Sequence, residues 1–326
     1  MNVLVTGGAG FIGSNFIRYM IDKYPHYLII NYDVLTYSGN LRSLEDVSNH
    51  QHYKFIKGDI NNSGLLDYVL QEYAIEAIVN FAAESHVDRS IANPAVFYTT
   101  NVLGTTALLE AAKKHRVKKF IQISTDEVYG SLGETGQFTE ETPLSPSSPY
   151  SASKASADLI VMAYYKTFGL DVNITRCSNN YGPYQYPEKL IPLAITNALE
   201  NKPIPVYGTG RNTRDWLHVH DHCTALDLVL HKGWQGSIYN IGGNNERRNI
   251  EIVGQILKEL GKPKELIAFV QDRKGHDWRY TIDSTKLQRE LGWKPAYSFE
   301  KGLAETLQWY VHHKAWWGPL KHNTTS

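Results

Sequence analysis

The feature that most constrains the fold of this chain is a regular alternation of short β-branched runs and longer helical patterns in its first half. Strands are expected at residues 3–6, 28–32, 53–57, 77–81, 120–124 and 172–176, with helices between them at 14–23, 64–72, 101–115 and 151–168. The strand runs are mostly apolar throughout, as in strands that are covered on both faces. The alternation predicts an α/β fold with a doubly wound parallel sheet and a ligand crevice at the carboxyl ends of the strands.

The pattern changes after about residue 180. Prolines at 183, 187, 192, 203 and 205 interrupt regular structure, and no further clean series of strands and helices follows. One more sheet strand is expected at 237–241 and helices at 250–260 and 283–291, the latter ended by Gly292. We therefore expect a nucleotide-binding domain over 1–180, to which about 215–241 return, and a smaller, mostly C-terminal α/β substrate lobe over 181–326. The tail from Gly318 onward is expected to be frayed.

Composition excludes several classes of function. Lys plus Arg and Asp plus Glu number 33 each, so no net charge attracts nucleic acid or an anionic membrane. Cys177 and Cys223 are the only cysteines, which favours a reducing compartment over a disulfide scaffold. There is neither an apolar run long enough to span a bilayer nor a leader-like N-terminus. We expect a cytoplasmic protein without nucleic-acid or membrane partners.

A glycine-rich turn follows the first expected strand. The sequence G-G-A-G-F-I-G at 7–13 has the spacing G-x-x-G-x-x-G, which lets the backbone and a helix N-terminus approach a pyrophosphate. Asp33 ends the second strand, twenty residues beyond Gly13, where its carboxylate can accept both ribose hydroxyls of adenosine. The same carboxylate would repel a 2′-phosphate, so the turn predicts a Rossmann-type site for NAD rather than NADP.

A tyrosine and a lysine four residues apart indicate hydride chemistry. Tyr150 and Lys154 share one face of a helix, so the ammonium lies beside the phenol. Its charge, with that of a nicotinamide, is expected to lower the pKa of the phenol towards that of a general base. The spacing is common by chance. Together with the glycine-rich turn it indicates hydride transfer at a carbinol carbon.

Two adjacent carboxylates end the fifth expected strand, in the sequence S-T-D-E-V-Y-G at 124–130. In an unknown loop, Asp126 and Glu127 would most simply be a solvated acidic turn. Next to a nicotinamide they are costly to place for packing alone. A dehydrogenase or epimerase needs only a hydroxyl donor and the tyrosine. The additional acid and base therefore predict additional proton transfers, as an elimination requires.

Over nearly its full length the chain resembles the dTDP-glucose 4,6-dehydratases, which are extended short-chain dehydrogenases/reductases. The triplet Thr125-Asp126-Glu127 is the most specific match, because related GDP-mannose dehydratases typically carry Ser at the position of Asp126 and epimerases lack the pair. The matching stretches are 6–13, 33–40 (D-V-L-T-Y-S-G-N), 81–90 (F-A-A-E-S-H-V-D-R-S), 124–130, 150–154, 176–184 (R-C-S-N-N-Y-G-P-Y), 188–192 (E-K-L-I-P) and 214–216.

The resemblance implies a lyase that converts dTDP-glucose to dTDP-4-keto-6-deoxyglucose and water on tightly bound NAD. Tyr150 takes the proton of the sugar O4 while C4 is oxidised, and Lys154 and Thr125 orient O4. Glu127 then removes the C5 proton, Asp126 protonates the departing O6 hydroxyl, hydride returns to C6, and Glu127 re-protonates C5. This division needs Glu127 ionised and Asp126 protonated. The downstream pathway, rhamnose or another deoxysugar, stays open.

The resemblance also implies the binding residues. The cofactor would contact Gly7, Gly10, Phe11, Ile12, Gly13, Asp33, Val34, Leu35, Thr36, Asp59, Ile60, Phe81, Ala82, Ala83, Ser85, Thr100, Tyr150, Lys154 and Asn180. The nucleotide sugar would contact Ser85, Thr125, Asn179, Lys189, Leu190, Pro205, Val206, Tyr207, Arg214, Asn249, Asp272, Arg273 and His276. Arg214 suits a diphosphate clamp, although in isolation it would be taken for a surface arginine. Lys274 replaces a proline that is usual in the family, so the loop 272–276 should be less rigid.

Two further patterns favour structural explanations. His218, His220 and His222 could suggest a metal, but alternate residues of a strand cannot all face one ion, and we expect no metal site. Cys177 has no paired base and is expected to be a buried thiol.

Helices 101–115 and 151–168 carry apolar and aromatic residues such as Met162, Tyr164 and Tyr165. Relatives pair two such helices from each subunit into a four-helix bundle, so the resemblance implies a homodimer, although both helices could simply cover the sheet. The alternative functions are a UDP-sugar 4-epimerase or decarboxylase of the same fold, or a non-catalytic NAD-sensing protein.

Overall fold

The structure is a computed structural model that describes residues 1–272 and 275–322. At its centre lies a sheet in the order β10-β6-β5-β4-β1-β2-β3, in which all neighbouring strands are parallel. Its strands are β1 (Asn2–Thr6), β2 (Leu28–Asp33), β3 (Tyr53–Lys57), β4 (Ala77–Asn80), β5 (Lys119–Thr125), β6 (Val172–Cys177) and β10 (Ile238–Ile241). The doubly wound parallel sheet and its strands, 237–241 included, are confirmed.

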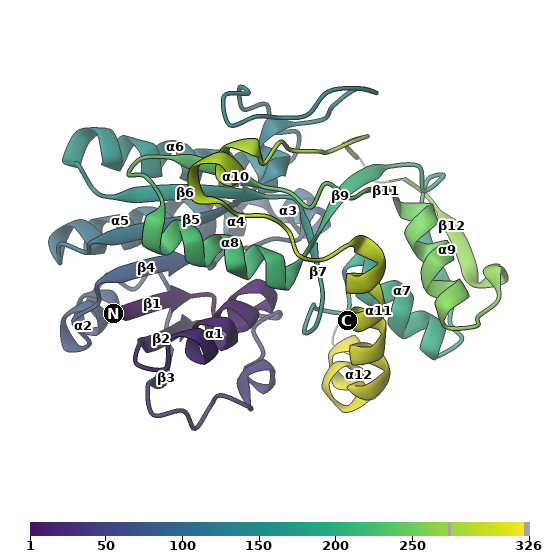
Figure 1. The fold of residues 1–326 in the computed structure, drawn as a ribbon, viewed down its shortest axis with the longest axis horizontal. Coiled ribbons are helices and arrows are strands. Elements are labelled where there is room, and N and C mark those ends of the chain that lie inside the picture. Colours follow the sequence, from purple (N-terminus) through teal and green to yellow (C-terminus); the bar gives the residue numbers. More distant parts are fainter. Residues whose placement is uncertain (273–274, 323–326) are drawn as a thin grey trace.

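Helices cover both faces of this sheet (Figure 1). One face carries α1 (Phe11–Lys23), α8 (Val219–Lys232) and α10 (Thr285–Leu291), and the other carries α2 (Ser63–Glu72), α5 (Thr105–Lys114) and α6 (Pro149–Phe168). Side chains such as Phe16 and Leu226 on one side and Leu66 and Leu109 on the other are buried against the strands. Each such side chain contributes about 1.5–3 kcal/mol, and this double cover explains why the strands are apolar on both faces.

The helix expected at 101–115 begins differently from the prediction. Short helices α3 (Val87–Ala92) and α4 (Pro94–Phe97) lead into a π-helical segment, η2 (Tyr98–Gly104), before α5 starts. Within η2 the amide of Asn101 donates to Ser153 Oγ at 2.8 Å and to the carbonyl of Glu84 at 3.0 Å. Asn101 thereby ties the loop after β4 to α6.

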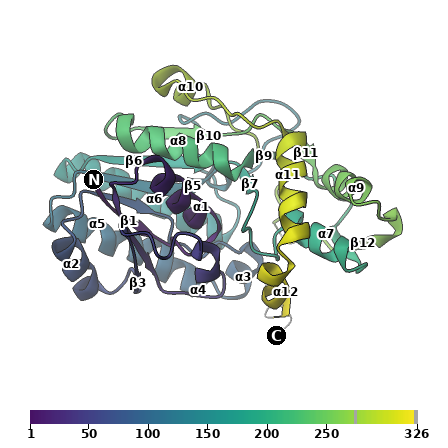
Figure 2. The same cartoon turned by 60° about the horizontal axis from the view of Figure 1, so that its bottom comes forward.

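The remaining elements form what we call the C-terminal lobe, to the right in Figure 1 and seen from another side in Figure 2. Its core includes the buried side chains of Trp216, Phe299 and Trp317. One sheet has the order β11-β9-β7, and in a second β8 pairs with β12 in parallel. The elements are β7 (Asn179–Tyr181), β8 (Ile204–Tyr207), β9 (Thr213–His218), β11 (Glu246–Arg248), β12 (Ile267–Val270), α7 (Leu190–Leu199), α9 (Asn249–Glu259), α11 (Phe299–His312) and α12 (Lys314–His322).

Three 3-10 helices complete the described chain: η1 (Leu41–Leu44), η3 (Asp126–Tyr129) and η4 (Lys264–Leu266). The helices expected at 250–260 and 283–291 are confirmed as α9 and α10, and Gly292 ends α10 at a φ of 71°. The division of the chain into a nucleotide-binding domain and a substrate lobe stays a prediction.

The prediction of a frayed tail from Gly318 onward is wrong for residues 318–322. These residues belong to α12, because Trp316 and Trp317 are buried and Lys321 donates to Asn197 at 2.7 Å and to Glu200 at 2.9 Å. Residues 323–326 lie outside the described part of the chain.

The histidine-rich segment is also not the strand that was expected. β9 ends at His218 and α8 begins at Val219. The His218 ring stacks on Tyr297 with 4.0 Å between centroids, and His222 Nδ1 lies 2.9 Å from Asn180 Oδ1. Burial lowers the pKa of both histidines to about 3, so they are neutral packing groups. Over residues 1–272 and 275–322, no cluster of three or more His, Cys, Asp or Glu side chains has a metal-binding arrangement.

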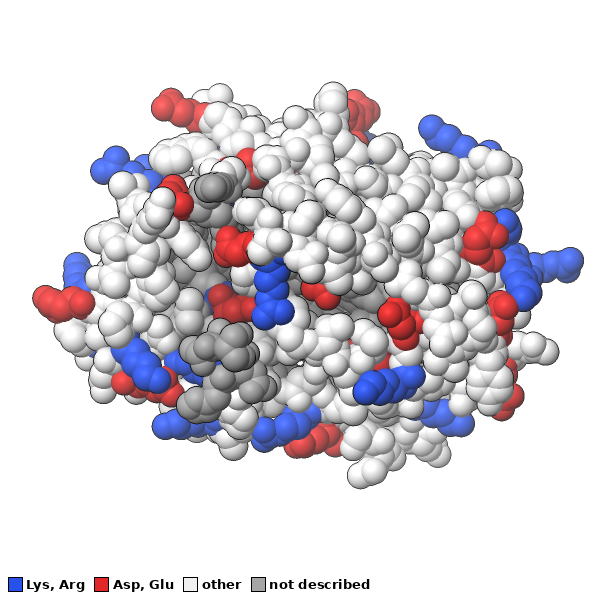
Figure 3. All heavy atoms as spheres, turned by 180° about the vertical axis from the view of Figure 1, so that it is seen from behind, with Lys and Arg blue, Asp and Glu red and all other residues white. Residues whose placement is uncertain are grey.

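Acidic and basic side chains are interspersed over the face in Figure 3, with a hollow near its middle. This agrees with the balanced composition. Among the described residues, no helix combines the length and apolarity that a membrane span requires.

Candidate active site

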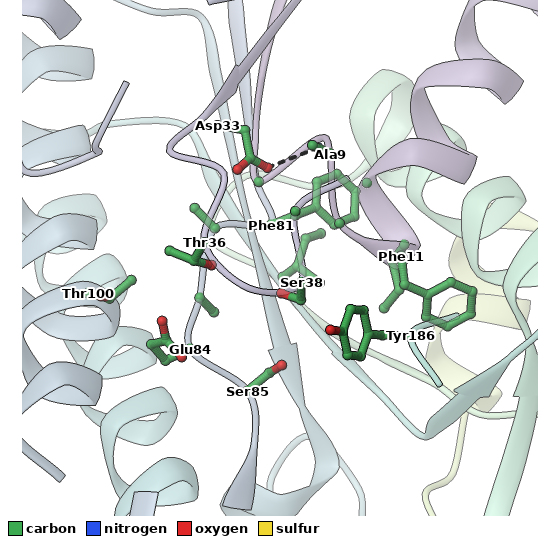
Figure 4. A pocket seen from close by; sticks show the side chains of 18 of the residues that line it. Ala9, Phe11, Asp33, Thr36, Ser38, Phe81, Glu84, Ser85, Thr100 and Tyr186 are labelled. Atoms are coloured by element: carbon green, nitrogen blue, oxygen red, sulfur yellow. Dashed lines mark hydrogen bonds between the residues drawn. The ribbon is translucent and has the colours of Figure 1, made fainter. Parts of the chain in front are cut away.

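A cavity of about 500 Å³ opens at the carboxyl ends of the central strands. This is the crevice where doubly wound sheets bind ligands. Its walls come from the glycine-rich turn, the loops after β2, β3, β4 and β5, residues 96, 99 and 100, the start of α6, parts of the segment 177–189, and Trp316 of α12. Figure 4 shows Asp33, Thr36, Phe81 and Ser85 around this cavity.

The glycine-rich turn has no room for a side chain at Gly7 or Gly13. Gly7 has a φ of 64°, and a Cβ on it would lie 2.6 Å from the backbone nitrogen of Ala82. A Cβ on Gly13 would lie 2.5 Å from the carbonyl oxygen of Gly7. Glycine is therefore required at both positions. The turn leads directly into α1 at Phe11, whose N-terminal amides favour an anionic group.

Asp33 is fixed at the end of β2 by two backbone amides. Its Oδ2 accepts from Ala9 N at 2.9 Å, drawn as a dashed line in Figure 4, and its Oδ1 accepts from Leu35 N at 2.7 Å. Burial raises the pKa of Asp33, while the two amides partly oppose this rise. The carboxylate therefore stands in one orientation at the cavity wall, which fits the two hydroxyls of an unphosphorylated adenosine ribose. The residues present fit NAD.

Asp33→Asn should weaken NAD binding about 10- to 100-fold, because a hydrogen bond to a charged group contributes about 1.5–3 kcal/mol. Discrimination against NADP should fall as well, since the repelling charge is lost. Equilibrium titration of cofactor-free protein with both nucleotides measures this. The exposed α1 residue Asp22 supplies the control Asp22→Asn. Unchanged NAD affinity in Asp33→Asn would show that Asp33 does not contribute to NAD binding.

The carboxylate pair stands on a tight turn after β5. Thr125 Oγ1 accepts the N–H of Glu127 at 3.2 Å and starts η3, and the same hydroxyl lies 3.3 Å from Asp126 Oδ1. Asp126 is 2% exposed, and its Oδ2 is buried with no hydrogen-bond partner among the described residues. Burial raises the pKa of Asp126 well above its usual value, and the charges of Glu127 and Asp215 raise it further. Burial therefore favours the protonated form of Asp126, and its Oδ2 is left to serve a ligand.

Tyr150 and Lys154 lie on the first turns of α6. Ser148 and Ser151 form a capping box at the helix start and Pro149 occupies its first position. Lys154 Nζ donates to the carbonyl of Ile123 at 2.6 Å, which fixes the lysine at the end of β5. Both side chains are buried and line the cavity with the carboxylate pair.

In the protein alone the pKa of Tyr150 is raised and not lowered, so the predicted lowering, which includes the charge of a bound nicotinamide, stays a prediction. Burial raises the pKa of the phenol well above its usual value, and the negative charge of Glu127 adds to this. Burial also lowers the pKa of Lys154. The spacing in sequence gave the shared helix face but not the desolvation of the tyrosine. A positive charge next to the phenol is needed before it can act as a base.

The predicted cofactor residues line the cavity with one exception. Leu35 is not part of its wall. It has a φ of 58°, and its backbone amide holds Asp33 instead. The residues that do line the cavity are Gly7, Gly10, Phe11, Ile12, Gly13, Asp33, Val34, Thr36, Asp59, Ile60, Phe81, Ala82, Ala83, Ser85, Thr100, Tyr150, Lys154 and Asn180.

The predicted substrate residues divide into two groups. Ser85, Thr125, Asn179 and Lys189 line the same cavity. The cavity wall does not include Leu190, Pro205, Val206, Tyr207, Arg214, Asn249, Asp272 and His276. Arg273 lies outside the described residues.

Four of these outlying residues have other partners. The Val206 side chain is buried in the core of the C-terminal lobe. Arg214 donates to the carbonyls of residues 213, 277 and 278 and stacks on the Tyr280 ring at 4.2 Å. Asp272 and His276 pair with each other at 2.6 Å. A role for these residues in binding a nucleotide sugar stays a prediction.

Several cavity residues were not predicted at all. Tyr37 and Ser38 follow β2, Tyr186 and Glu188 precede α7, and Trp316 comes from α12. The first four fall in or beside stretches that matched the family, which was the available signal, but no local motif indicates Trp316. Cys177 also lines the cavity, and burial raises the pKa of its thiol to about 12, as expected for an inert thiol.

A Tyr–Lys pair beside a dinucleotide cavity provides hydride chemistry on a carbinol carbon. This combination places the chain among the extended short-chain dehydrogenases/reductases. Comparison with known proteins shows to which family within this class the chain is similar. A family model described as GDP-mannose 4,6 dehydratase matches residues 4–306. A dTDP-glucose 4,6-dehydratase from Xanthomonas campestris pv. campestris (strain B100) is 53% identical, over 96% of this chain and 94% of its own length.

Solved structures agree. The dTDP-glucose 4,6-dehydratase from Bacillus anthracis str. Ames, crystallised in complex with NAD, is 60% identical with a TM-score of 0.93, covering 98% of this chain and 99% of that one. The enzyme of the same name from Streptomyces venezuelae, also with NAD bound, is 51% identical with a TM-score of 0.95, covering 98% and 100%. The chain belongs to the dTDP-glucose 4,6-dehydratase family.

Proposed function

We propose that the chain is an NAD-dependent hydro-lyase that converts dTDP-glucose to dTDP-4-keto-6-deoxyglucose and water. The observation that carries the proposal is the Asp126 side chain: a buried carboxyl whose Oδ2 has no hydrogen-bond partner among the described residues, adjacent to Glu127 and in the same cavity as Tyr150 and Lys154. The cavity thus combines a site for redox chemistry with a separate acid and base for elimination. Two relatives named dTDP-glucose 4,6-dehydratase were crystallised with NAD, which supports the cofactor.

Bound NAD would supply a hydride acceptor for C4 of the sugar and, later, the hydride for C6. At C4, Tyr150 accepts the O4 proton, while Lys154, fixed on the carbonyl of Ile123, and Thr125 orient and polarise that oxygen. The 4-ketone then makes the C5–H acidic.

Elimination falls to the carboxylate pair. Glu127 removes the C5 proton as Asp126 gives its proton to the O6 hydroxyl, which leaves as water. Glu127 re-protonates C5 when C6 is reduced. Two neighbouring carboxyls can divide the acid and base roles when their environments separate their pKa values, and the burial of Asp126 provides the acid.

The test is mass and NMR analysis of the products from a panel of nucleotide glucoses and nucleotide glucuronic acids; NMR distinguishes C4 epimers, which have the same mass. Loss of water from dTDP-glucose with a 4-keto-6-deoxy product supports the proposal. A galactose-configured product would indicate an epimerase, and release of CO₂ from a uronic acid substrate would indicate a decarboxylase. A protein that binds NAD but changes no sugar would be a sensor. The same panel measures the preference for dTDP over UDP, which at present is supported by the relatives alone.

The dehydration rate should fall as pH rises through the raised pKa of Asp126, because the elimination uses its protonated form. The sign follows from burial, which keeps the proton on this carboxyl to a higher pH than on an ordinary aspartate. A pH profile of single-turnover dehydration measures the alkaline limb. In Asp126→Asn this limb should disappear from the much slower residual reaction. An unchanged limb in that variant would assign it to another group.

We also propose that Arg214, Tyr207, Asn249, Asp272 and His276 contact the nucleotide sugar. Arg214 would then exchange at least one of its present carbonyl partners for the diphosphate. The cytoplasm is the proposed compartment, supported by two free, buried cysteines.

A homodimer through η2, α5 and α6 is proposed as well. Large apolar side chains are exposed along these helices, including Leu103 at 60%, Leu159 at 64% and Phe168 at 53%. Such side chains on neighbouring helices suit a four-helix bundle made with a second copy of the chain.

The double variant Leu103→Asp/Leu159→Asp should therefore be monomeric at concentrations at which the unaltered protein is dimeric. Two buried charges on each side of an apolar interface cost more than a small interface can offset. Light scattering after size exclusion measures the mass. Phe269→Asp, 61% exposed on β12, is the matched control. A dimeric double variant would place the interface elsewhere.

A further inference from the structure

The loop that follows Asp33 touches the C-terminal lobe at two points beside the cavity. The first point is Tyr37, whose hydroxyl donates to Glu188 Oε1 at 3.0 Å. The guanidinium of Arg89 lies 3.6 Å from the Tyr37 ring centroid, and His86 Nε2 lies 3.6 Å from the other oxygen of Glu188. The Glu188 side chain is 11% exposed, so this hydrogen bond is shielded from water. A shielded bond to a carboxylate is stronger than one at the surface.

The second point is Ser43, at the far end of the same loop. The indole of Trp316 donates to Ser43 Oγ at 3.3 Å, although the two residues are 273 positions apart. The Ser43 carbonyl accepts from Arg18 Nη2 at 2.5 Å, and the Arg18 guanidinium lies 4.4 Å from the Tyr184 ring centroid. Trp316 is 6% exposed and packs edge-on against Tyr184. Helix α12 is thus anchored on η1, which contains Ser43.

Both points belong to the cavity wall. Tyr37, Ser43, Glu188 and Trp316 all line the same cavity as the glycine-rich turn and the catalytic residues. The loop between the points begins at Asp33, whose Oδ1 is held by the amide of Leu35 within the loop. Fastening the loop at both ends therefore also holds the carboxylate that fits the adenosine ribose.

We propose that residues 34–44 form a clasp, fastened by the Tyr37–Glu188 and Trp316–Ser43 hydrogen bonds, which retains the dinucleotide during turnover. The proposal rests on the proposed function, in which the hydride taken from C4 must be returned to C6. If the reduced cofactor left between these steps, the oxidised sugar could not receive its hydride at C6 and the reaction would stop. Tyr37 and Trp316 are positioning residues in this scheme: they hold the loop and not the reacting atoms.

The clasp is tested by measuring how fast NAD leaves the purified protein. Tyr37→Phe and Trp316→Phe each remove one hydrogen bond and keep an aromatic ring. Each should speed NAD dissociation about three- to tenfold, and the double variant should approach the product of the two effects. Dissociation is followed by dilution into an excess of a dehydrogenase that captures free NAD. Added NAD should restore the activity lost by the double variant.

Two matched controls separate retention from general stability. Glu290→Gln weakens an equivalent hydrogen bond from a tyrosine hydroxyl to a shielded carboxylate. Glu290 lies in α10, outside the cavity wall; its side chain is 10% exposed and accepts from the Tyr239 hydroxyl at 3.1 Å. Trp317→Phe alters the neighbouring tryptophan, whose indole donates to the Tyr310 carbonyl within the lobe. Both controls should keep the original NAD dissociation rate, even where the melting temperature falls.

The outcomes are distinct. Faster NAD loss in the two clasp variants, but not in the controls, supports the clasp. Two results would overturn it. One is an NAD dissociation rate that rises in step with the fall in melting temperature across all four single variants, controls included. The other is an unchanged NAD dissociation rate in the double variant. Because the rate is measured without substrate, it is independent of the product panel: a protein that retains NAD through the clasp but forms no 4-keto-6-deoxy sugar would contradict the proposed function alone.

Discussion

Glu127→Gln should oxidise the sugar at C4 and then stall, because no base remains to take the C5 proton. General bases typically contribute about 10²–10⁴-fold to a proton transfer, and the overall dehydration rate should fall by about that factor. The first oxidation should change less than about tenfold, since Tyr150 and Lys154 are untouched. Stopped-flow absorbance of reduced cofactor and mass analysis of the quenched sugar measure the two steps separately.

Asp126→Asn separates the acid from the base in the same cavity. It should still exchange the C5 hydrogen with deuterated water, whereas loss of the O6 hydroxyl should slow by about 10²–10⁴-fold. Glu127→Gln should lose the exchange as well. Glu134→Gln, an exposed carboxylate in the loop beyond η3, is the control for a change of charge. Full dehydration rates in both Asp126→Asn and Glu127→Gln would show that the pair has been assigned the wrong role.

Tyr150→Phe should stop the reaction before any oxidation, with a loss of about 10²–10⁴-fold in the first hydride step. The phenol oxygen is the group proposed to receive the O4 proton, and its replacement leaves an apolar edge in the cavity. Lys154 should stay in place through its bond to Ile123. No transient of reduced cofactor should build up, in contrast to Glu127→Gln, and the NAD content should be unchanged.

Tyr129→Phe is the matched control for loss of a buried tyrosine hydroxyl. Tyr129 donates to Asn240 at 2.8 Å and contacts Arg176, but it lies outside the cavity wall. Its loss should lower stability by about 1 kcal/mol and leave the first oxidation intact. If Tyr150→Phe retained an oxidation rate close to that of Tyr129→Phe, another group would have to be the base.

The parts of this molecule that were predicted from sequence are those encoded locally. The turn at 7–13 needs glycine because of close backbone contacts within one strand–turn–helix unit, and Asp33 follows at a distance set by that unit. Tyr150 and Lys154 face the same way because they are one helical turn apart. The pair Asp126–Glu127 ends a strand whose carboxyl end must face the crevice.

The remainder depends on packing between distant segments. Arg214 was expected to hold a diphosphate. In the structure a β-bridge between Thr213 and Arg279 brings the carbonyls of residues 277 and 278 to the guanidinium of Arg214. Trp316 reaches the cavity only because α12 folds back onto η1. The raised pKa of Tyr150 is a consequence of burial, which spacing along a helix cannot reveal.

The position of Trp316 bears on how the protein matures in the cell. A wall of the cavity is supplied by Trp316, which lies 273 positions after Ser43, its hydrogen-bond partner in the same wall. While the chain is still being made, the glycine-rich turn and Asp33 emerge from the ribosome well before α12. Firm loading of the dinucleotide should therefore wait until α12 has been made, and a substitution in that helix would be felt at a site built mainly from the first half of the chain.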